Sequence, residues 1–277
     1  MAHAGAATVT CIWMHPIERL RWIARDRDEA PTALAVEAAW AISELALDEP
    51  PAVVTACRRL VESHVTVGPL WWVAATVLVA SDPDQAARRA VGELFSDPTA
   101  ELLAAGLGER LVGDAPIVVA CPAETVLEAC SHRASAVVRV VAPPPGLQAE
   151  VRRFAAVVSE ASGWEYEEAE EAVEGAAVVL VEALAAGSRG VLVTAAAARL
   201  AQTARDASVP LWGVAGVGRV LHDQLLGEVI RRAGDDIELI GPGAFDFVVG
   251  PSGLESPVEA LSRGRCPPAP ELVVRAG

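Results

Sequence analysis

The sequence contains no lysine and no asparagine, so all 22 of its basic residues are arginine. Without lysine, a mechanism that passes through a lysine Schiff base is excluded. The 37 acidic residues outnumber the basic ones, and the formal net charge is −15. Proteins that bind nucleic acids generally need a basic surface to neutralise phosphates, so no nucleic-acid partner is expected.

Cysteines are few and scattered: Cys11, Cys57, Cys121, Cys130 and Cys266, an odd number with no C-x-x-C pair. This pattern disfavours a disulfide framework and a cysteine zinc site, and it fits a reducing compartment. We therefore expect a cytoplasmic protein with no metal and no cofactor.

Long apolar runs are also lacking. The most apolar stretch, residues 67–80, is too short to cross a bilayer and contains Gly68 and Pro69. The first residues lack the basic region and apolar core of a signal peptide. With 52% hydrophobic and 21% charged residues, the composition is that of a globular protein, and no membrane partner is expected.

Acidic residues gather in one segment: Glu165, Glu167, Glu168, Glu170, Glu171 and Glu174. Hard cations bind carboxylates, but calcium loops also need glycine and asparagine turns, which this segment lacks. We interpret the cluster as the solvated face of a helix.

Apolar periodicity divides the chain near Gly113. Before it, the pattern predicts helices over 16–27, 32–47, 50–64, 70–79, 83–94 and 99–110. After it, short apolar runs at 117–120, 137–141, 176–181 and 210–214 alternate with predicted helices over 124–132, 147–160 and 192–207. Such alternation favours a parallel sheet covered on both faces. We expect an α/β protein with a helical N-terminal domain, 1–112, and a Rossmann-like domain, 113–277.

Several stretches of the sequence carry a resemblance to a known family. They are 117–128, with Cys121 after its apolar run, 138–146, 178–214 and 242–251 in the second half, and 28–31 and 62–71 in the first. In order and spacing they resemble the alpha, beta and delta subunits of translation initiation factor 2B. The same family includes isomerases of methylthioribose 1-phosphate and ribose 1,5-bisphosphate. The resemblance implies a Rossmann-like C-terminal domain preceded by helices.

The polar positions of that family are mostly changed here. The resemblance places Cys121 at the isomerases' catalytic cysteine and Ala183 where they carry the catalytic aspartate. Val193 and Thr194 stand at their Asn-Lys pair, and Glu29 replaces a glycine of their Arg-Gly-Ala-Pro loop. The arginine of their Glu-Ser-Arg-Pro loop is a proline. A buried charge without a partner is costly, so a protein that no longer binds the substrate can replace such residues with apolar ones.

Glu182 is the remaining carboxylate beside the missing aspartate. In a strand, neighbouring side chains point to opposite faces, so Glu182 is expected to point away from the pocket of Cys121 while Ala183 faces it. We predict an apolar pocket lined by Ala183, Val193 and Cys121.

These observations favour an initiation-factor-2B-like protein with a degenerate sugar-phosphate site. It would be a non-catalytic regulatory, scaffold or ligand-binding protein, with a phosphorylated small molecule as a candidate ligand. The alternative is an aldose–ketose sugar-phosphate isomerase with a site rewired around Cys121. A third, weaker hypothesis is a nucleotide-binding module that uses the glycine-rich segment 213–218.

The resemblance also implies self-assembly. Members of the family dimerise through the Rossmann-like half, so a homodimer or larger assembly is expected. The apolar segment with Phe245, Phe247, Val248 and Val249 would form an exposed patch in a monomer.

Overall fold

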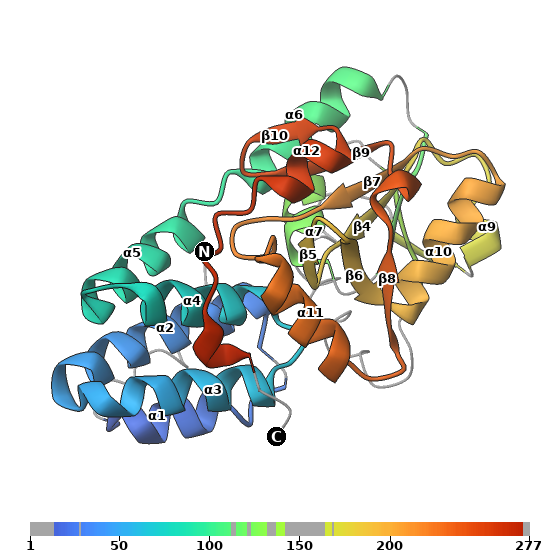
Figure 1. Cartoon of the computed structure of the whole chain (residues 1–277). Coiled ribbons are helices and arrows are strands. Elements are labelled where there is room, and N and C mark those ends of the chain that lie inside the picture. The colour runs from blue at the N-terminus through green and yellow to red at the C-terminus, as the bar shows by residue number, and fades with distance from the viewer. Residues whose placement is uncertain are drawn as a thin grey trace.

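The computed structural model describes residues 14–27, 29–111, 115–120, 123–131, 137–141, 164–167 and 169–273, without the side chains of 164–167. A layer of helices is followed by a larger α/β part (Figure 1). The first helices are α1 (Pro16–Ile23), α2 (Pro31–Asp48), α3 (Val53–Ser63), α4 (Gly68–Val79), α5 (Pro83–Phe95) and α6 (Thr99–Arg110).

Prolines and polar caps start these helices where the sequence predicts them. Pro31 begins α2 and Pro83 begins α5, and Asp82 caps α5 by accepting a hydrogen bond from the Gln85 N–H at 3.0 Å. Proline suits this position because the first helical N–H has no partner within the helix. Helix α4 is buried on nearly all sides, which explains why its sequence is apolar throughout. Within the described ranges, no helix has the length and hydropathy needed to span a membrane.

A mostly parallel sheet forms the centre of the second part. Its strands are β1 (Ile117–Ala120), β2 (Val138–Val141), β3 (Trp164–Glu167), β4 (Val178–Glu182), β7 (Leu211–Val214), β9 (Phe247–Gly250) and β10 (Gly253–Glu255). Their order is β10-β9-β7-β4-β1-β2-β3, and β10 alone is antiparallel. The predicted α/β class with a Rossmann-like sheet is confirmed.

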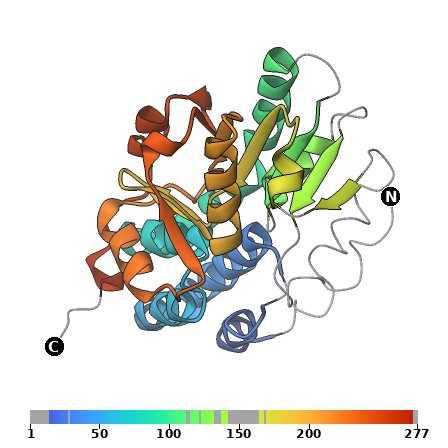
Figure 2. The ribbon, with the colours of Figure 1, turned by 90° about the vertical axis from the view of Figure 1, so that its right-hand side faces the viewer.

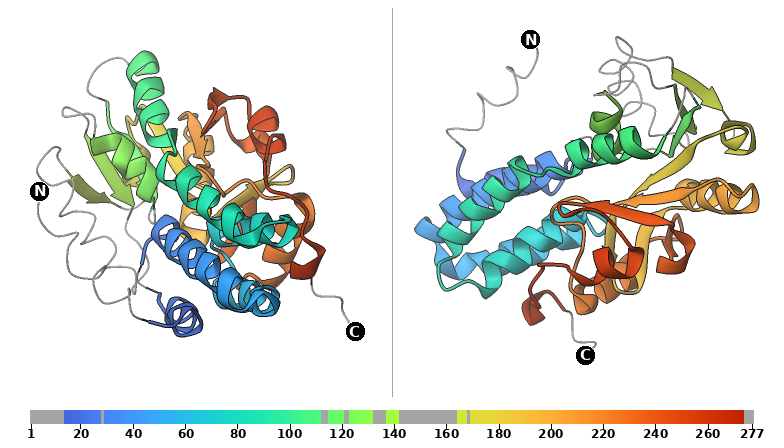
Figure 3. Two further views of the ribbon diagram at one scale, coloured as in Figure 1. Left: turned by 90° about the vertical axis from the view of Figure 1, so that its left-hand side faces the viewer. Right: turned by 90° about the horizontal axis from the view of Figure 1, so that it is seen from above.

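Helices cover both faces of this sheet (Figures 2 and 3). Helices α6 and α7 (Glu124–Ser131) share one buried cluster with strand residues such as Val119 and Leu180. On the other face, α9 (Ala169–Val173), α10 (Ala195–Asp206) and α12 (Pro257–Ser262) pack against Val118 and Val181. Because both faces of the sheet are covered, residues on both sides of each strand are buried, and the strand sequences are therefore continuous apolar runs.

A second, antiparallel sheet was not predicted. It has the order β5-β6-β8, with β5 (Ala185–Gly187), β6 (Gly190–Thr194) and β8 (Ile237–Ile240). The helix expected over 192–207 therefore begins at Ala195, because Val191 to Val193 are buried in strand β6. Gly190 closes the β5–β6 turn at φ +141°, where a Cβ atom would stand 2.2 Å from the Ile240 carbonyl oxygen.

Elements on each side of the expected boundary at 112 pack against the other part. Helix α6 precedes it but packs with α7, β9 and β10. In return, α11 (Asp223–Arg232) and the C-terminal turn η3 (Pro270–Leu272) contribute Leu225, Leu226 and Leu272 to the buried cluster of α1 to α5. The two parts therefore share a continuous packed contact.

Two expectations about surfaces are wrong. The acidic segment is not one helix, because Glu165 and Glu167 lie in β3 and only Glu170 and Glu171 lie in α9. Over the described residues, no group of acidic, histidine or cysteine side chains could hold a metal. The segment with Phe245 forms no exposed patch either, since that ring and Val248 and Val249 are buried. They fill the space beside β7, where Gly213 leaves room. The helix expected over 147–160 lies outside the described residues.

Candidate functional site

Strand order identifies a switch point at the carboxyl ends of β1 and β4. Strands β2 and β3 lie on one side of β1, and the later strands β4, β7 and β9 lie on its other side. The order in which strands are added to the sheet therefore reverses between the neighbours β1 and β4. In open α/β sheets, ligands bind beyond the carboxyl ends of the strands at such a switch point. The residues that meet here are Glu182 at the end of β4, the first turn of α7, and Arg219 from the loop after β7.

Glu182 is a buried carboxylate held by donors on every side. Its side chain is 3% exposed. Oε2 accepts the backbone N–H of Val126 at 3.1 Å, and Oε1 accepts the Thr125 hydroxyl at 3.2 Å and the Arg219 guanidinium at 2.6 Å. Burial raises the pKa of Glu182 to about 7, and nearby Glu124 acts in the same direction, whereas these donors lower it.

Arg219 is the buried cation of the site. Its side chain is 4% exposed, and one amino group donates to the Ala183 carbonyl at 2.6 Å. The other reaches Glu182 and, at 3.2 Å, Glu124. The side chain thereby joins the end of β4 to the first turn of α7.

Glu124 connects this cluster to the helical part. Its Oε1 accepts the Thr32 hydroxyl and, at 3.3 Å, the Thr32 backbone N–H at the start of α2. A carboxylate is stabilised near a helix N-terminus, where N–H groups lack partners within the helix. The four side chains Thr32, Glu124, Glu182 and Arg219 thus form one network across the contact between the two parts.

The structure places Glu182 and Ala183 on different sides of the strand end. Alternation along the strand holds: Ala183 packs with Val193 in the cluster beneath α10, while Glu182 reaches α7. Glu182 contacts Thr125 and Val126 in the first turn of α7, the helix that follows position 121 in the sequence. Cys121 itself lies outside the described residues. The Glu182 network at α7 is charged, and the apolar pocket expected from Ala183, Val193 and Cys121 stays a prediction.

The remaining candidate residues lie apart from the network. Thr194 caps α10 by accepting the Ala197 N–H at 3.2 Å. Glu29 is exposed, and its carboxylate accepts the adjacent Ala30 N–H at 3.2 Å. Sequence reasoning missed Arg219 and Thr32, and it treated Glu124 as part of a motif without giving it a role.

The glycine-rich segment 213–218 has a packing role that explains its composition. A Cβ atom on Gly216 would stand 2.5 Å from the Asp97 carboxylate, and one on Gly218, at φ +79°, would stand 3.0 Å from Pro69. The same Asp97 carboxylate accepts the Val217 N–H at 2.7 Å. Close packing against Asp97 and Pro69 therefore explains why glycines stand at 216 and 218, and a nucleotide-binding role is not needed to explain them.

Comparison of the sequence with family models and with curated proteins finds no match. Comparison of the structure finds translation initiation factor eIF-2B from Pyrococcus horikoshii OT3, with a TM-score of 0.68 and 17% identity over 89% of this chain and 98% of that one. The chain has the fold of initiation factor 2B subunits.

Two further structures have the same fold. The tetrameric eIF2B-beta2-delta2 complex from C. thermophilum gives a TM-score of 0.66 and 16% identity over 87% of this chain and 90% of that one. The 5-methylthioribose 1-phosphate isomerase from Pyrococcus horikoshii OT3 gives 0.59 and 14%, over 88% and 85%. The resemblance inferred from the sequence is confirmed for the initiation factor 2B-like fold, and at these identities the comparison concerns the fold alone.

Proposed function

We propose that this chain is a non-catalytic protein of initiation factor 2B-like fold whose switch-point site is occupied by its own charged groups. One observation carries the proposal: the Glu182 carboxylate accepts hydrogen bonds from the Val126 N–H, the Thr125 hydroxyl and the Arg219 guanidinium. These are the donor types that a bound phosphate uses, namely a backbone N–H at a helix start, a hydroxyl and an arginine. A sugar phosphate would have to displace a carboxylate that is already fully bonded.

The apolar side of the same strand end supports the proposal. Ala183 and Val193, which stand at polar positions of the isomerases, are fully buried among aliphatic side chains. A phosphorylated sugar brought there would lose hydration without gaining partners. A regulatory or scaffold role, with any small ligand bound elsewhere on the chain, fits this arrangement best.

An isomerase assay tests the proposal. With methylthioribose 1-phosphate or ribose 1,5-bisphosphate, we expect no conversion above that of a buffer control, measured by NMR of the sugar. Conversion that disappears in the Cys121→Ser variant would overturn the proposal, because it would show that the cysteine position still acts on these substrates.

A second candidate function is an aldose–ketose isomerase with a rewired site. The pKa of Glu182, raised to about 7, favours it, because a general acid–base works best near the operating pH. In that case Glu182 would exchange the proton in place of an aspartate at position 183. Turnover that is lost in Glu182→Gln and kept in Glu29→Gln would select this function.

We also propose that the chain forms a homodimer or larger assembly in the cytoplasm. The neighbour from C. thermophilum is a tetrameric complex, and three cysteines of the described part, Cys57, Cys130 and Cys266, are buried thiols suited to a reducing compartment. Light scattering at micromolar protein should give at least twice the 28.8 kDa of one chain. A mass of one chain at that concentration would contradict the assembly.

A further inference from the structure

A pocket is lined by residues 215–218 of the loop that leads to Arg219. It has a volume of about 310 Å³ and opens at the carboxyl ends of β7 and β9. Its lining comes from the end of α5, the loop 215–218, the turn 250–252 and the segment 263–265. Strand ends of an α/β sheet and contacts between two packed parts are both common places for small-molecule sites.

The walls of this pocket combine apolar and charged groups. Val217, Val220 and Pro251, which are at least partly exposed, supply apolar surface, and Ser96 and Ser252 supply hydroxyls. Arg263 and Arg265 supply the positive charge. Apolar surface beside a small number of polar and charged groups is typical of sites that bind small organic molecules.

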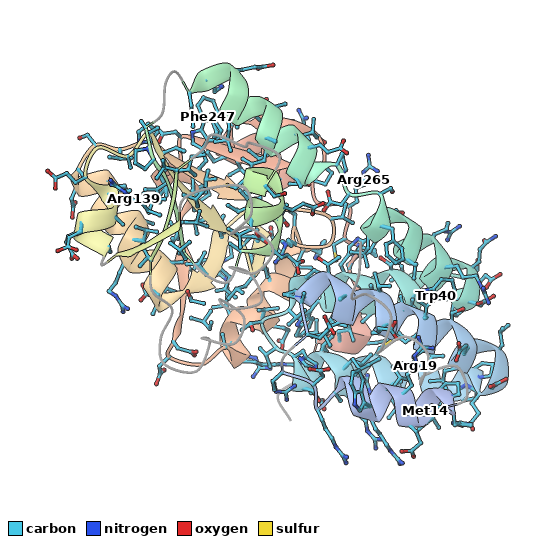
Figure 4. All side chains as sticks on the ribbon, turned by 180° about the vertical axis from the view of Figure 1, so that it is seen from behind. Met14, Arg19, Trp40, Arg139, Phe247 and Arg265 are labelled. Atoms are coloured by element: carbon cyan, nitrogen blue, oxygen red, sulfur yellow. The ribbon has the colours of Figure 1, made fainter. Side chains whose placement is uncertain are left out.

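The two arginines differ in what they already bind. Arg263 is paired with Glu255, which also lines the pocket. Arg265 is exposed and makes no ion pair with any residue that the structure describes. Its side chain lies where α5 and α6 meet (Figure 4). Arg265 is thus the group available to a ligand's negative charge.

One acidic group limits what the pocket can take. Glu93, on the last turns of α5, lines the pocket too, and its carboxylate would repel an anion placed beside it. The same carboxylate would accept a hydrogen bond from a hydroxyl on a ligand. The lining therefore suits an anionic group at Arg265, an apolar body against Val217 and Val220, and a hydroxyl toward Glu93.

We propose that this pocket is a binding site for a small organic anion with an apolar body, distinct from the Glu182 site. The anionic group is a carboxylate or a phosphate, and Arg265 recognises it. Because this pocket shares only the loop 215–219 with the Glu182 network, the proposal goes beyond the proposed function and does not depend on it.

Calorimetric titration of the full chain tests this site with two probes, 3-phenyllactate for the carboxylate and phenyl phosphate for the phosphate. We expect at least one probe to bind, and the stronger one identifies the anionic group. Arg265→Gln should weaken binding about tenfold or more, since a hydrogen bond to a charged group is lost. Ser252→Trp, an exposed substitution at the rim, should abolish binding by filling the entrance.

Arg189→Gln is the matched control, because Arg189 is an exposed arginine in the β5–β6 turn and does not line the pocket. It should leave both affinities unchanged. Failure of both probes to bind at millimolar concentration would overturn the proposal. So would equal affinity in the parent chain, Arg265→Gln and Ser252→Trp, or an equal loss in Arg189→Gln.

Discussion

Replacing Arg219 by methionine should lower the free energy of unfolding by about 3 to 5 kcal/mol at about pH 8, above the pKa of Glu182, because it removes the cation from a buried ion pair. Glu182, with 3% of its side chain exposed, would keep its carboxyl group without the guanidinium, and Glu124 would lose a partner as well. The Ala183 carbonyl would lose its donor at 2.6 Å. Urea denaturation followed by circular dichroism measures the change.

Two further variants separate charge from packing at this position. Arg189→Met changes an exposed arginine and should shift stability by less than about 0.5 kcal/mol. The double variant Arg219→Met with Glu182→Gln removes both charges of the closest pair, so it should recover a good part of the loss. If the double variant is as unstable as the sum of the two single ones, the network contributes through packing and our account of it is wrong.

Much of the fold follows from patterns within single segments. The runs at 117–120 and 176–181 are apolar at every position, and this pattern predicted strands buried on both faces. The small sheet was missed because β5 has only 3 residues and β6 leads directly into an alanine-rich helix, so periodicity does not separate strand from helix there. Thr194, the cap of α10, was the local signal that marks the boundary.

The site could be predicted only in part, because its pairs join distant segments. Strand alternation correctly separated Glu182 from Ala183. The helix that meets Glu182 depends on which face of the sheet the β1–α7 connection covers, and no residue near 182 specifies that. Arg219 is 37 positions from Glu182 and follows a loop whose glycines pack against Asp97 and Pro69. Nothing in the local sequence connects these two charges.

Glu182 should make the stability of the protein depend on pH in a direction unusual for a carboxylate. Its pKa is raised from 4.5 to about 7 in the folded chain, mainly by burial. Between these values the folded state binds the proton and the unfolded state does not, so the contribution of Glu182 to stability falls as pH rises through this window. From about pH 4.5 to above pH 7, the loss reaches about 3 kcal/mol.

Comparison with Glu182→Gln isolates this contribution from the other titrating groups. Burial lowers the pKa of His64, so His64 makes stability rise with pH in part of the same range, and both proteins contain it. The carboxyl pKa of Glu228 is lowered by Arg231, so its effect lies below the ordinary range of a glutamate. Urea denaturation at about pH 5 and about pH 8 should therefore show the variant gaining about 2.5 kcal/mol relative to the parent chain. A difference that stays constant across this range would mean that Glu182 remains ionised throughout, held by Arg219.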